Sequence, residues 1–179
     1  MTDNDKTVTI FGTSKARPGD EVFQTACEIG KALAQRGFTI ANGGYGGTML
    51  AAAKGASQAG GRIIGVTCSA FRKSSANEYV TEEIIADSLV ERLNKLVDLG
   101  DAYVVLTGGT GTLLELALVW ELKNKAFAKA DKPIIIAGGF WNGLIDLMGR
   151  MDPDCAKCVE VAKNDAEVIE FIDRNLNND

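Results

Sequence analysis

The stretch AYVVLTGGTGTLLELALVWELKN, residues 102–124, decides the fold of this chain. It opens with a short apolar run, residues 102–106, whose valines are typical of a buried strand. A glycine cluster and then a long helical pattern follow without a break. A strand that turns through glycines into a helix directs free backbone N–H groups and the positive end of the helix dipole at one point. The stretch therefore predicts a phosphate site at the start of the helix, which we take as the active centre.

Segments typical of strands and of helices alternate along the rest of the chain. Strands are predicted at residues 7–11, 38–41, 62–66, 133–137 and 159–162, in addition to residues 102–106. Helices are predicted at residues 20–36, 49–59, 88–100, 141–148 and 165–175, in addition to the one that ends near Asn124, and residues 67–79 are predicted to form a polar loop. The alternation predicts the α/β class, with a doubly wound parallel sheet covered by helices on both faces. With 179 residues, 46% of them hydrophobic, the chain is expected to form one domain over residues 1–179.

The charge of the chain limits its partners. The net charge is −5 and no block of lysines or arginines occurs, which argues against long nucleic acids and anionic membranes. A small anionic ligand stays compatible because it needs only a local site. The N-terminal sequence has no basic start, and no run approaches the roughly 20 apolar residues that a membrane span needs. The sequence therefore predicts a cytoplasmic protein.

The chain contains no histidine, which removes the commonest general base and the usual zinc ligand. Its four cysteines are too scattered for a disulfide framework, so reduced thiols are expected. Cys155 and Cys158 have the spacing of a redox or half-zinc motif, but the sequence offers no second ligand pair, and we interpret them as structural. Catalysis must then use carboxylates, Arg or Lys, hydroxyls and backbone dipoles, and we predict neither a metal ion nor a cofactor.

Three glycine-bearing turns follow predicted strands and should meet at one edge of the sheet, where ligands of such folds bind. In the first two turns the candidate substrate-binding residues are Gly12, Thr13, Ser14, Gly43, Gly44, Tyr45, Gly46 and Gly47. In the third turn the candidate phosphate-binding residues are Gly108, Gly109, Thr110, Gly111 and Thr112. Tyr45 is a candidate for stacking on a base. The helix predicted from Ser88 starts at the same edge, which brings Arg92 toward the same crevice.

These glycines match neither of two common nucleotide-binding motifs. The dinucleotide fingerprint GxGxxG should follow the first strand, where only Gly12 stands, and Leu114 occupies the third glycine position of the later run. A Walker-type loop needs Lys and then Ser or Thr after its last glycine, whereas Thr112 is followed by Leu113. The sequence thus argues against an NAD-dependent enzyme and against a kinase or NTPase.

Residues 108–115, GGTGTLLE, resemble the GGxGTxxE motif of the LONELY GUY family, the cytokinin riboside 5′-monophosphate phosphoribohydrolases. The similarity covers about residues 7–137, including the glycine-rich loop at residues 42–49 and the pair Glu91-Arg92. The resemblance implies a Rossmann-like fold and hydrolysis of a purine nucleoside 5′-monophosphate, with or without a substituent at N6, to free base and ribose 5-phosphate. It also implies that Glu115 and Arg92 are the catalytic pair and that the protein is a homodimer.

The residues suit that chemistry. The N-glycosidic bond breaks through an oxocarbenium-like state, whose positive charge a carboxylate beside the ribose can stabilise. Glu115 follows Thr112 by about one helical turn, so we expect it to face the ribose while the glycine turn holds the phosphate. Arg92 is assigned to the phosphate or to the departing base. A structural interpretation stays open for both, because Thr112 and Glu115 match a capping box and Arg92 could be a solvated residue paired with Asp87 or Glu91.

A function without catalysis is the alternative. Molybdenum-cofactor carriers and nucleotide-sensing modules share the fold and bind without hydrolysis, and residues 16–18, Ala-Arg-Pro, resemble the carriers. Leu93 stands where hydrolytic members of the family usually have Lys, and Thr107 stands where they usually have Pro. The alternative is therefore a carrier or sensor of a nucleotide or of molybdenum cofactor.

The helix of the opening stretch is apolar around more of its circumference than one packed face requires. We therefore expect part of it to be buried against a second copy, in line with the homodimer that the resemblance implies. Trp120 and Trp141 are expected in the core or in that interface. Ser88 and Glu91 match a capping box at the start of the preceding helix, and we interpret Glu91 as a cap.

Overall fold

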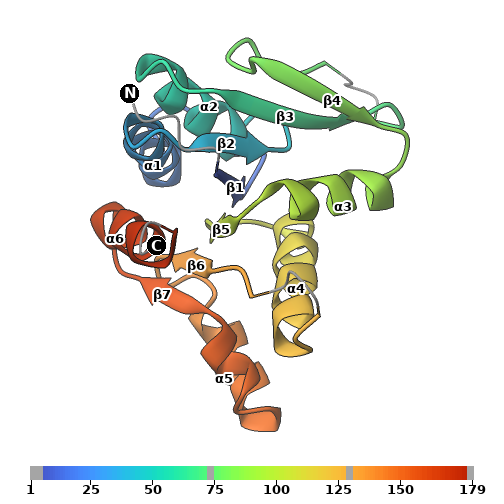
Figure 1. Cartoon of the computed structure of the whole chain (residues 1–179), viewed down its shortest axis with the longest axis vertical. Helices are drawn as coiled ribbons and strands as arrows, with labels where there is room; N and C mark the ends of the chain where they lie inside the picture. Colours follow the sequence, from blue (N-terminus) through green and yellow to red (C-terminus); the bar gives the residue numbers. More distant parts are fainter. Residues whose placement is uncertain (1–5, 72–74, 128–130, 177–179) are drawn as a thin grey trace.

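The computed structural model describes residues 6–71, 75–127 and 131–176, and in it seven strands form one sheet in the order β4-β3-β2-β1-β5-β6-β7 (Figure 1). The strands are β1 (Thr7–Phe11), β2 (Thr39–Asn42), β3 (Ile63–Cys68), β4 (Glu82–Ala86), β5 (Ala102–Val105), β6 (Ile134–Ala137) and β7 (Glu160–Ala162). Neighbouring strands are parallel throughout. The chain builds the sheet outward from β1 to β4 and then returns to the other side of β1. This reversal opens a crevice at the carboxyl ends of the strands.

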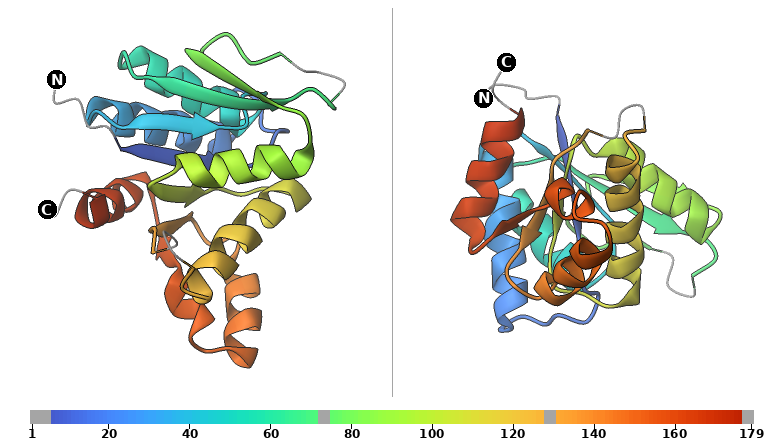
Figure 2. Two further views of the ribbon diagram at one scale, coloured as in Figure 1. Left: turned by 45° about the vertical axis from the view of Figure 1, so that its right-hand side comes forward. Right: turned by 90° about the horizontal axis from the view of Figure 1, so that it is seen from below.

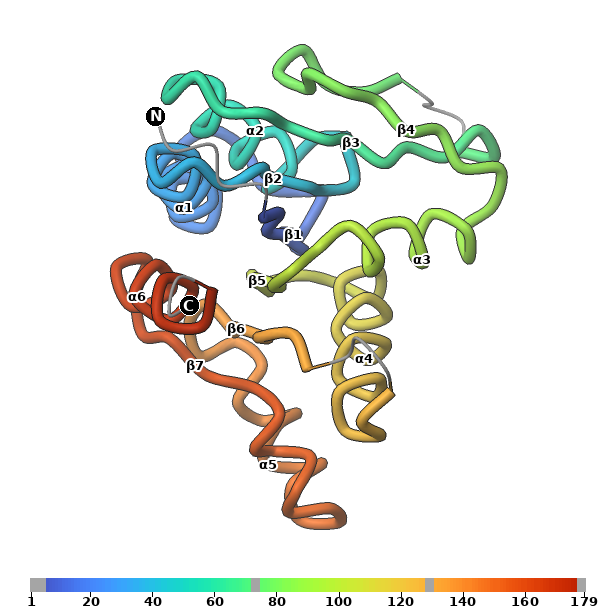
Figure 3. Tube along the Cα trace, viewed as in Figure 1, coloured from blue at the N-terminus to red at the C-terminus, as the bar shows by residue number. Residues whose placement is uncertain are grey.

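Helices cover both faces of the sheet, which confirms the predicted α/β doubly wound architecture. One face carries α1 (Glu21–Gln35), α2 (Thr48–Gln58) and α6 (Asp165–Leu176), and the other carries α3 (Leu89–Leu99) and α4 (Thr110–Asn124) (Figure 2). The short 3-10 helix η1 (Cys155–Cys158) contacts both α4 and α5 (Asn142–Met151). The backbone trace places α5 at the end of the molecule opposite β4 (Figure 3).

Two apolar layers hold the sheet between its helices. Successive side chains of a strand point to opposite faces, so Val104 of β5 packs in the layer under α1 and α2, while Tyr103 and Val105 pack in the layer under α3 and α4. Strands buried on both faces are expected to be continuous apolar or β-branched runs, as β1, β5 and β6 are. Trp120 and Trp141 are buried in the second layer, where their indole N–H groups donate to the carbonyls of Cys155 (2.7 Å) and Leu106 (2.9 Å).

The helices α1 and α2 lie in backbone contact. A Cβ on Gly30 would lie 2.2 Å from the Ala52 carbonyl oxygen, and a Cβ on Gly55 would lie 1.9 Å from that of Cys27. Neither position leaves room for a side chain. The close contact fixes the start of α2, and with it the glycine-rich turn before α2, relative to the sheet.

The edge strand β4 is an element that the sequence pattern does not predict. Its sequence, EEIIA, begins with two exposed glutamates, and only Ala86 is fully buried. Charged residues on an edge strand discourage pairing with other chains, but they also remove the apolar alternation by which a strand is recognised. Parallel pairing with β3, from Ile64 with Glu82 to Cys68 with Ala86, makes the segment a strand. The predicted polar loop begins two residues too early, because Thr67 and Cys68 belong to β3.

The start of α3 is capped by Ser88, as predicted, since the Ser88 Oγ accepts the Glu91 N–H at 3.2 Å. The Glu91 carboxylate accepts the N–H of Asp87 at 2.8 Å, so the reciprocal bond reaches one residue further back than a capping box requires. The sequence places Leu89, Leu93, Leu96 and Val97 at helical spacing, which predicts one buried face, but Leu89 is 46% exposed. Within the described ranges, none of the helices has both the length and the apolar character that crossing a bilayer requires.

Candidate active site

A cavity of about 860 Å³ lies beyond the carboxyl ends of β1 and β2, beside the first turns of α3 and α4. The predicted site residues that line it are Gly12, Thr13, Ser14, Gly43, Tyr45, Gly46, Arg92, Gly109, Thr110, Gly111, Thr112 and Glu115. They come from four segments that are far apart in the sequence. The cavity is therefore the place where the glycine turns meet Arg92 and Glu115.

The other predicted site residues, Gly44, Gly47 and Gly108, shape the cavity from behind its lining. Gly47 has a φ of +67° and a Cβ there would lie 2.2 Å from the Thr13 carbonyl oxygen. A Cβ on Gly108 would lie 2.1 Å from Oγ1 of Thr112, so the absence of a side chain lets Thr112 pack over this turn. These glycines are required for backbone geometry and close approach.

The helix α4 begins at Thr110 with Gly109 as its N-cap residue. Thr112 is therefore inside the first turn, and the interpretation of Thr112 and Glu115 as a capping box is wrong. The Leu113 N–H donates to the Gly109 carbonyl at 2.9 Å. The N–H groups of residues 110–112 precede that bond and have no acceptor within the helix, as at every helix start. They lie at the wall of the cavity together with the positive end of the helix dipole, which suits an anion.

Arg92 is a buried residue, 7% exposed, that two backbone carbonyls hold in place. Its Nε donates to the Val66 carbonyl at 2.7 Å and its Nη2 donates to the Gly43 carbonyl at 3.2 Å. The guanidinium also lies 5.6 Å from the centre of the Tyr45 ring and 5.8 Å from that of the Phe71 ring, within the range of cation–π attraction. The alternative of a solvated arginine paired with Asp87 or Glu91 is wrong, because Arg92 is buried and pairs with Glu115.

Glu115 forms an ion pair with Arg92 in the lining of the cavity, with 3.7 Å between its Oε1 and Nη1 of the arginine. Its side chain is only 14% exposed. Burial raises the pKa of the Glu115 carboxyl to about 7, and the positive charge of Arg92 opposes this rise. A carboxyl whose pKa lies near neutrality in a cleft, next to a buried cation, is typical of a functional site.

Two asparagines hold the turn between β2 and α2 over the cavity. The Asn42 side chain accepts the Gly44 N–H at 2.8 Å and donates to the Met49 carbonyl at 3.2 Å. The Asn77 side chain donates to the carbonyls of Gly44 and Tyr45, both at 3.0 Å. The Tyr45 hydroxyl accepts the Cys68 N–H at 2.8 Å, which fixes its ring beside Arg92. Side-chain hydrogen bonds from Asn42 and Asn77 thus hold the backbone of this turn.

Several lining residues are not among the sequence candidates, notably Lys15, Met49, Phe71 and Leu89. Lys15 directly follows the first glycine turn, which is a signal that could have included it. Phe71 is the one aromatic residue of the segment between Cys68 and Asn77, but nothing local shows that it reaches Arg92. Leu89 matched the apolar face of its helix, so the pattern assigned it to the core.

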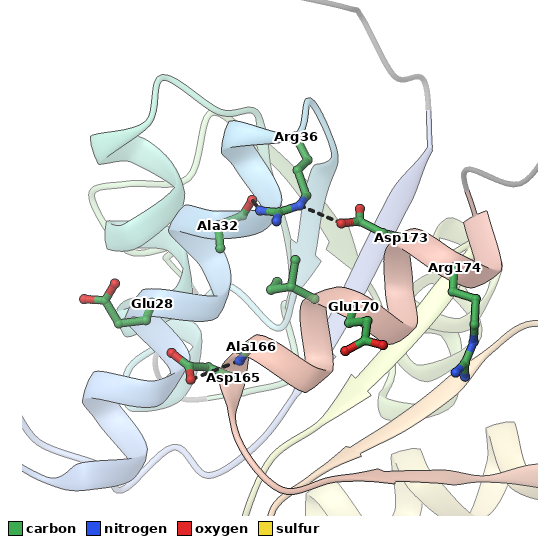
Figure 4. Close-up of a pocket in the computed structure, with 9 residues that line it drawn as sticks. Glu28, Ala32, Arg36, Asp165, Ala166, Glu170, Asp173 and Arg174 are labelled. Atoms are coloured by element: carbon green, nitrogen blue, oxygen red, sulfur yellow. Dashed lines mark hydrogen bonds and ion pairs between the residues drawn. The ribbon is translucent and has the colours of Figure 1, made fainter.

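A second cavity of about 750 Å³ lies between α1 and α6 (Figure 4). Its lining has four carboxylates, those of Glu28, Asp165, Glu170 and Asp173, against two cations, Arg36 and Arg174, and Arg174 is bonded to the Glu160 carboxylate. Arg36 is engaged by one of them, since its Nε donates to Asp173 Oδ2 at 2.7 Å. This concentration of negative charge disfavours a phosphate group, so the cavity beside α4 is the candidate active site.

Cys155 and Cys158 lie in η1, away from this cavity. Burial raises the pKa of both thiols, so they stay protonated at neutral pH, which agrees with a structural role. Among the residues that the structure describes, no three cysteine, aspartate or glutamate side chains are grouped closely enough to hold a metal ion.

The SLOG cluster4 family matches residues 5–146, a range that includes every segment lining the cavity. The chain belongs to this family. The resemblance of residues 108–115 to the LONELY GUY family is confirmed by this match and by relatives named as cytokinin riboside 5′-monophosphate phosphoribohydrolases.

Phosphoribohydrolases and molybdenum cofactor carriers are among the proteins that this SLOG cluster4 chain resembles. A protein from Mycobacterium tuberculosis named cytokinin riboside 5′-monophosphate phosphoribohydrolase is 34% identical over 155 residues, which cover 80% of this chain and 81% of that protein. A protein of the same name from Mycobacterium marinum is 30% identical, covering 69% of this chain and 67% of that protein. The solved structure of the molybdenum cofactor carrier protein from Chlamydomonas reinhardtii matches with a TM-score of 0.77 and 25% identity, covering 97% of this chain and 99% of that chain. The Rossmann-like fold is confirmed.

The raised pKa of Glu115 predicts how the stability of this SLOG cluster4 chain depends on pH. The ordinary pKa of the group is 4.5 and the folded value is about 7, so folding favours the protonated form. Its contribution to stability is complete below about pH 4.5 and is lost as the pH rises through 7. Relative to Glu115→Gln, which stays neutral, the free energy of unfolding of the wild type should fall by about 1–3 kcal/mol between pH 5 and pH 8.

Urea unfolding of both proteins at a series of pH values measures this difference. Groups other than Glu115 are common to the two proteins and cancel in the comparison. A difference that stays constant from pH 5 to pH 8 contradicts the raised pKa.

Proposed function

We propose that this protein hydrolyses the N-glycosidic bond of a purine nucleoside 5′-monophosphate, with or without a substituent at N6, to free base and ribose 5-phosphate. The observation that carries the proposal is the buried Glu115 carboxyl beside the first turn of α4. Along a helix axis, Glu115 is about 5–8 Å from residues 110–112. That separation suits a ligand whose phosphate binds the helix start and whose ribose lies against the carboxylate.

The reaction adds water across the bond between C1′ and the base nitrogen. The C1′–N bond breaks, its electron pair goes to the base, and positive charge develops on C1′ and the ring oxygen. The Glu115 carboxylate stabilises this charge and accepts a proton from the water whose oxygen bonds to C1′. An equivalent proton passes through water to the departing base nitrogen, so the base leaves neutral and the carboxylate is regenerated. Arg92 carries a buried positive charge that favours the ionised form of Glu115 and attracts the phosphate or the departing base.

Relatives support an enzyme of this kind. The name of the Mycobacterium tuberculosis protein, at 34% identity over four fifths of the chain, describes hydrolysis of a nucleoside 5′-monophosphate. The test is to incubate the purified protein with AMP and with an N6-substituted AMP, and to quantify free base and ribose 5-phosphate. Equal amounts of base and ribose 5-phosphate are expected. Absence of both products with both nucleotides contradicts the proposal.

A carrier without catalysis is the second candidate. The full-length match to the Chlamydomonas reinhardtii molybdenum cofactor carrier, together with Leu93 and Thr107, favours it. Tight binding of AMP by calorimetry, without release of base from AMP or from the N6-substituted AMP, supports the carrier and contradicts the hydrolase.

We also propose a homodimer formed through α4 and α5. A groove of about 380 Å³ between these helices is lined mostly by apolar residues, among them Leu113, Ala117, Trp120, Leu144, Met148 and Met151. The apolar residues of α4 lie on all sides of the helix, so they exceed what one packed face uses. A second copy would remove the rest from water.

Met148→Arg is expected to convert the dimer to a monomer, because it places a charge in the apolar groove. Light scattering after size-exclusion chromatography measures the mass of each variant. The matched control is Val161→Arg on β7, since both residues are 38% exposed and Val161 lies outside the groove. A wild type that runs as a monomer, or equal masses for the two variants, contradicts the proposed interface.

A further inference from the structure

The ends of two neighbouring strands hold the Arg92 guanidinium, and each contributes one carbonyl and one aromatic ring. The turn after β2 supplies the Gly43 carbonyl and the Tyr45 ring. β3 and the turn after it supply the Val66 carbonyl and the Phe71 ring. The centres of the two rings are 6.0 Å apart, so the rings lie side by side at one guanidinium.

Packing in the core does not account for the places of these two rings. Among the described residues, neither Tyr45 nor Phe71 belongs to the two apolar layers that hold the sheet, and Phe71 lines the cavity while 37% exposed. The backbone of Cys68 fixes both of them. Its N–H donates to the Tyr45 hydroxyl at 2.8 Å, and its carbonyl accepts the Phe71 N–H at 3.1 Å. What the two rings share is their contact with Arg92.

Aromatic rings stabilise a buried cation without neutralising it. Arg92 is 7% exposed, and burial of a charge is unfavourable unless other groups compensate for the lost water. The face of an aromatic ring attracts a cation but carries no net charge. A carboxylate in the place of either ring would instead compete with Glu115 for the guanidinium. The charge of Arg92 therefore stays directed to Glu115, and these two residues make up the buried inner end of the cavity.

The ion pair alone does not fix the guanidinium. The 3.7 Å between Nη1 of Arg92 and Oε1 of Glu115 exceeds the length of a hydrogen bond. The two carbonyls bind Nε and Nη2, and the rings attract the charge centred between the three nitrogens. Loss of a ring would therefore allow the guanidinium to shift relative to Glu115 while its bonds to the carbonyls remain.

Resting on the proposed function, we propose that Tyr45 and Phe71 are positioning residues that act on the hydrolysis through Arg92. They hold the guanidinium where its charge favours the ionised form of Glu115. The ionised carboxylate is the form that stabilises the charge on the ribose. A ring that positions Arg92 affects the rate of the chemical step, whereas a ring that stacks on the base affects the binding of the nucleotide.

Steady-state kinetics of base release from AMP by Phe71→Leu test this proposal. Leucine keeps an apolar side chain but has no ring face. We expect kcat to fall by about 5–30-fold, the equivalent of one cation–π contact at a buried site, with KM within about 2-fold of the wild type. Phe71→Tyr keeps the ring face and should restore kcat to within about 3-fold of the wild type. Phe71 is the better ring to replace, because Tyr45 also binds the Cys68 N–H.

The matched control is Phe171→Leu on α6. The Phe171 ring lies 4.7 Å from the guanidinium carbon of Arg174, outside the cavity. The same change thus removes the same kind of contact at a place that has no part in the reaction. Both kcat and KM of the control should stay within about 2-fold of the wild type.

A double-mutant cycle in urea unfolding tests the contact without turnover. It compares the midpoints of the wild type, Phe71→Leu, Arg92→Met and the protein with both changes. If the ring stabilises the cation, the drop in midpoint that Phe71→Leu causes should shrink to about half or less in the Arg92→Met background.

The outcomes separate this proposal from the proposed function. If the wild type releases no base, the proposed function falls, and the unfolding cycle still decides whether the ring holds Arg92. Equal drops in both backgrounds overturn the present proposal. It is overturned as well if Phe71→Leu raises KM and leaves kcat unchanged, which is the result of stacking on the base. A Phe71→Tyr protein as slow as Phe71→Leu, or equal losses of kcat in Phe71→Leu and Phe171→Leu, also contradict it.

Discussion

Replacing Glu115 with Gln is expected to slow the release of base from AMP by about 10²–10⁴-fold in a protein that still folds. Gln has nearly the shape of Glu but cannot carry the negative charge that balances the oxocarbenium-like state, and it cannot accept a proton from water. Arg92 keeps its bonds to the carbonyls of Val66 and Gly43, so the cavity keeps its form. Single-turnover rates with saturating AMP, read as free base by chromatography, measure the loss of the chemical step.

The matched control for this variant is Glu121→Gln. Glu121 lies in the same helix, but its side chain is 59% exposed and its partner is Lys125 at 4.0 Å. An exposed pair of this kind contributes little, so the control should keep its rate within about 2-fold. A Glu115→Gln protein as fast as the control would falsify the role assigned to Glu115, and the hydrolytic mechanism would then need another base.

Strands that are buried on both faces can be predicted from their own sequence, and the edge strand β7 is predicted as well, at residues 159–162. β1, β5 and β6 lie inside the sheet, and burial on both faces leaves an apolar or β-branched run that the sequence displays. β4 could not be predicted, because only its pairing with β3 makes it a strand and its exposed glutamates hide any alternation. The start of α4 is also not predicted correctly by the sequence pattern. The capping-box pattern of Thr112 and Glu115 predicts that the helix starts after Thr112. In the structure α4 begins two residues before Thr112, at Thr110, with Gly109 as its N-cap residue.

The position of the site could be predicted, whereas its contacts could not. The turn before α4 and the rule that ligands bind at the carboxyl edge of the sheet locate the cavity. The state of Arg92 depends on carbonyls that lie 26 and 49 residues away, in β3 and in the turn after β2. No local pattern around Arg92 shows these partners, so the sequence leaves a solvated arginine open as the alternative to a buried one. Burial also decides the pKa of Glu115, and burial is a property of the folded chain alone.

Gly43→Ala is expected to lower the rate of base release by about 10²-fold, because it displaces Arg92. A Cβ on Gly43 would lie 1.8 Å from Nη2 of Arg92 and 2.7 Å from Sδ of Met49. Both atoms are at the ends of flexible side chains, so the protein can yield by moving them. The added methyl group should therefore cost only about 1–3 kcal/mol of unfolding free energy, whereas the movement breaks the bond from Arg92 to the Gly43 carbonyl and changes its distance to Glu115.

Gly46→Ala separates this displacement from the effect of any methyl group in the same turn. A Cβ on Gly46 would have the Ser14 carbonyl oxygen as its nearest neighbour, at 3.9 Å, which is ordinary contact. The melting temperature of Gly46→Ala should stay within about 2 °C of the wild type, and that of Gly43→Ala should fall by several degrees. If Gly43→Ala has the same melting temperature as Gly46→Ala and hydrolyses AMP at the wild-type rate, the hydrogen bond to the Gly43 carbonyl does not hold Arg92 in place. In that case its position beside Glu115 does not govern the reaction, and the inner end of the cavity owes its chemistry to Glu115 alone.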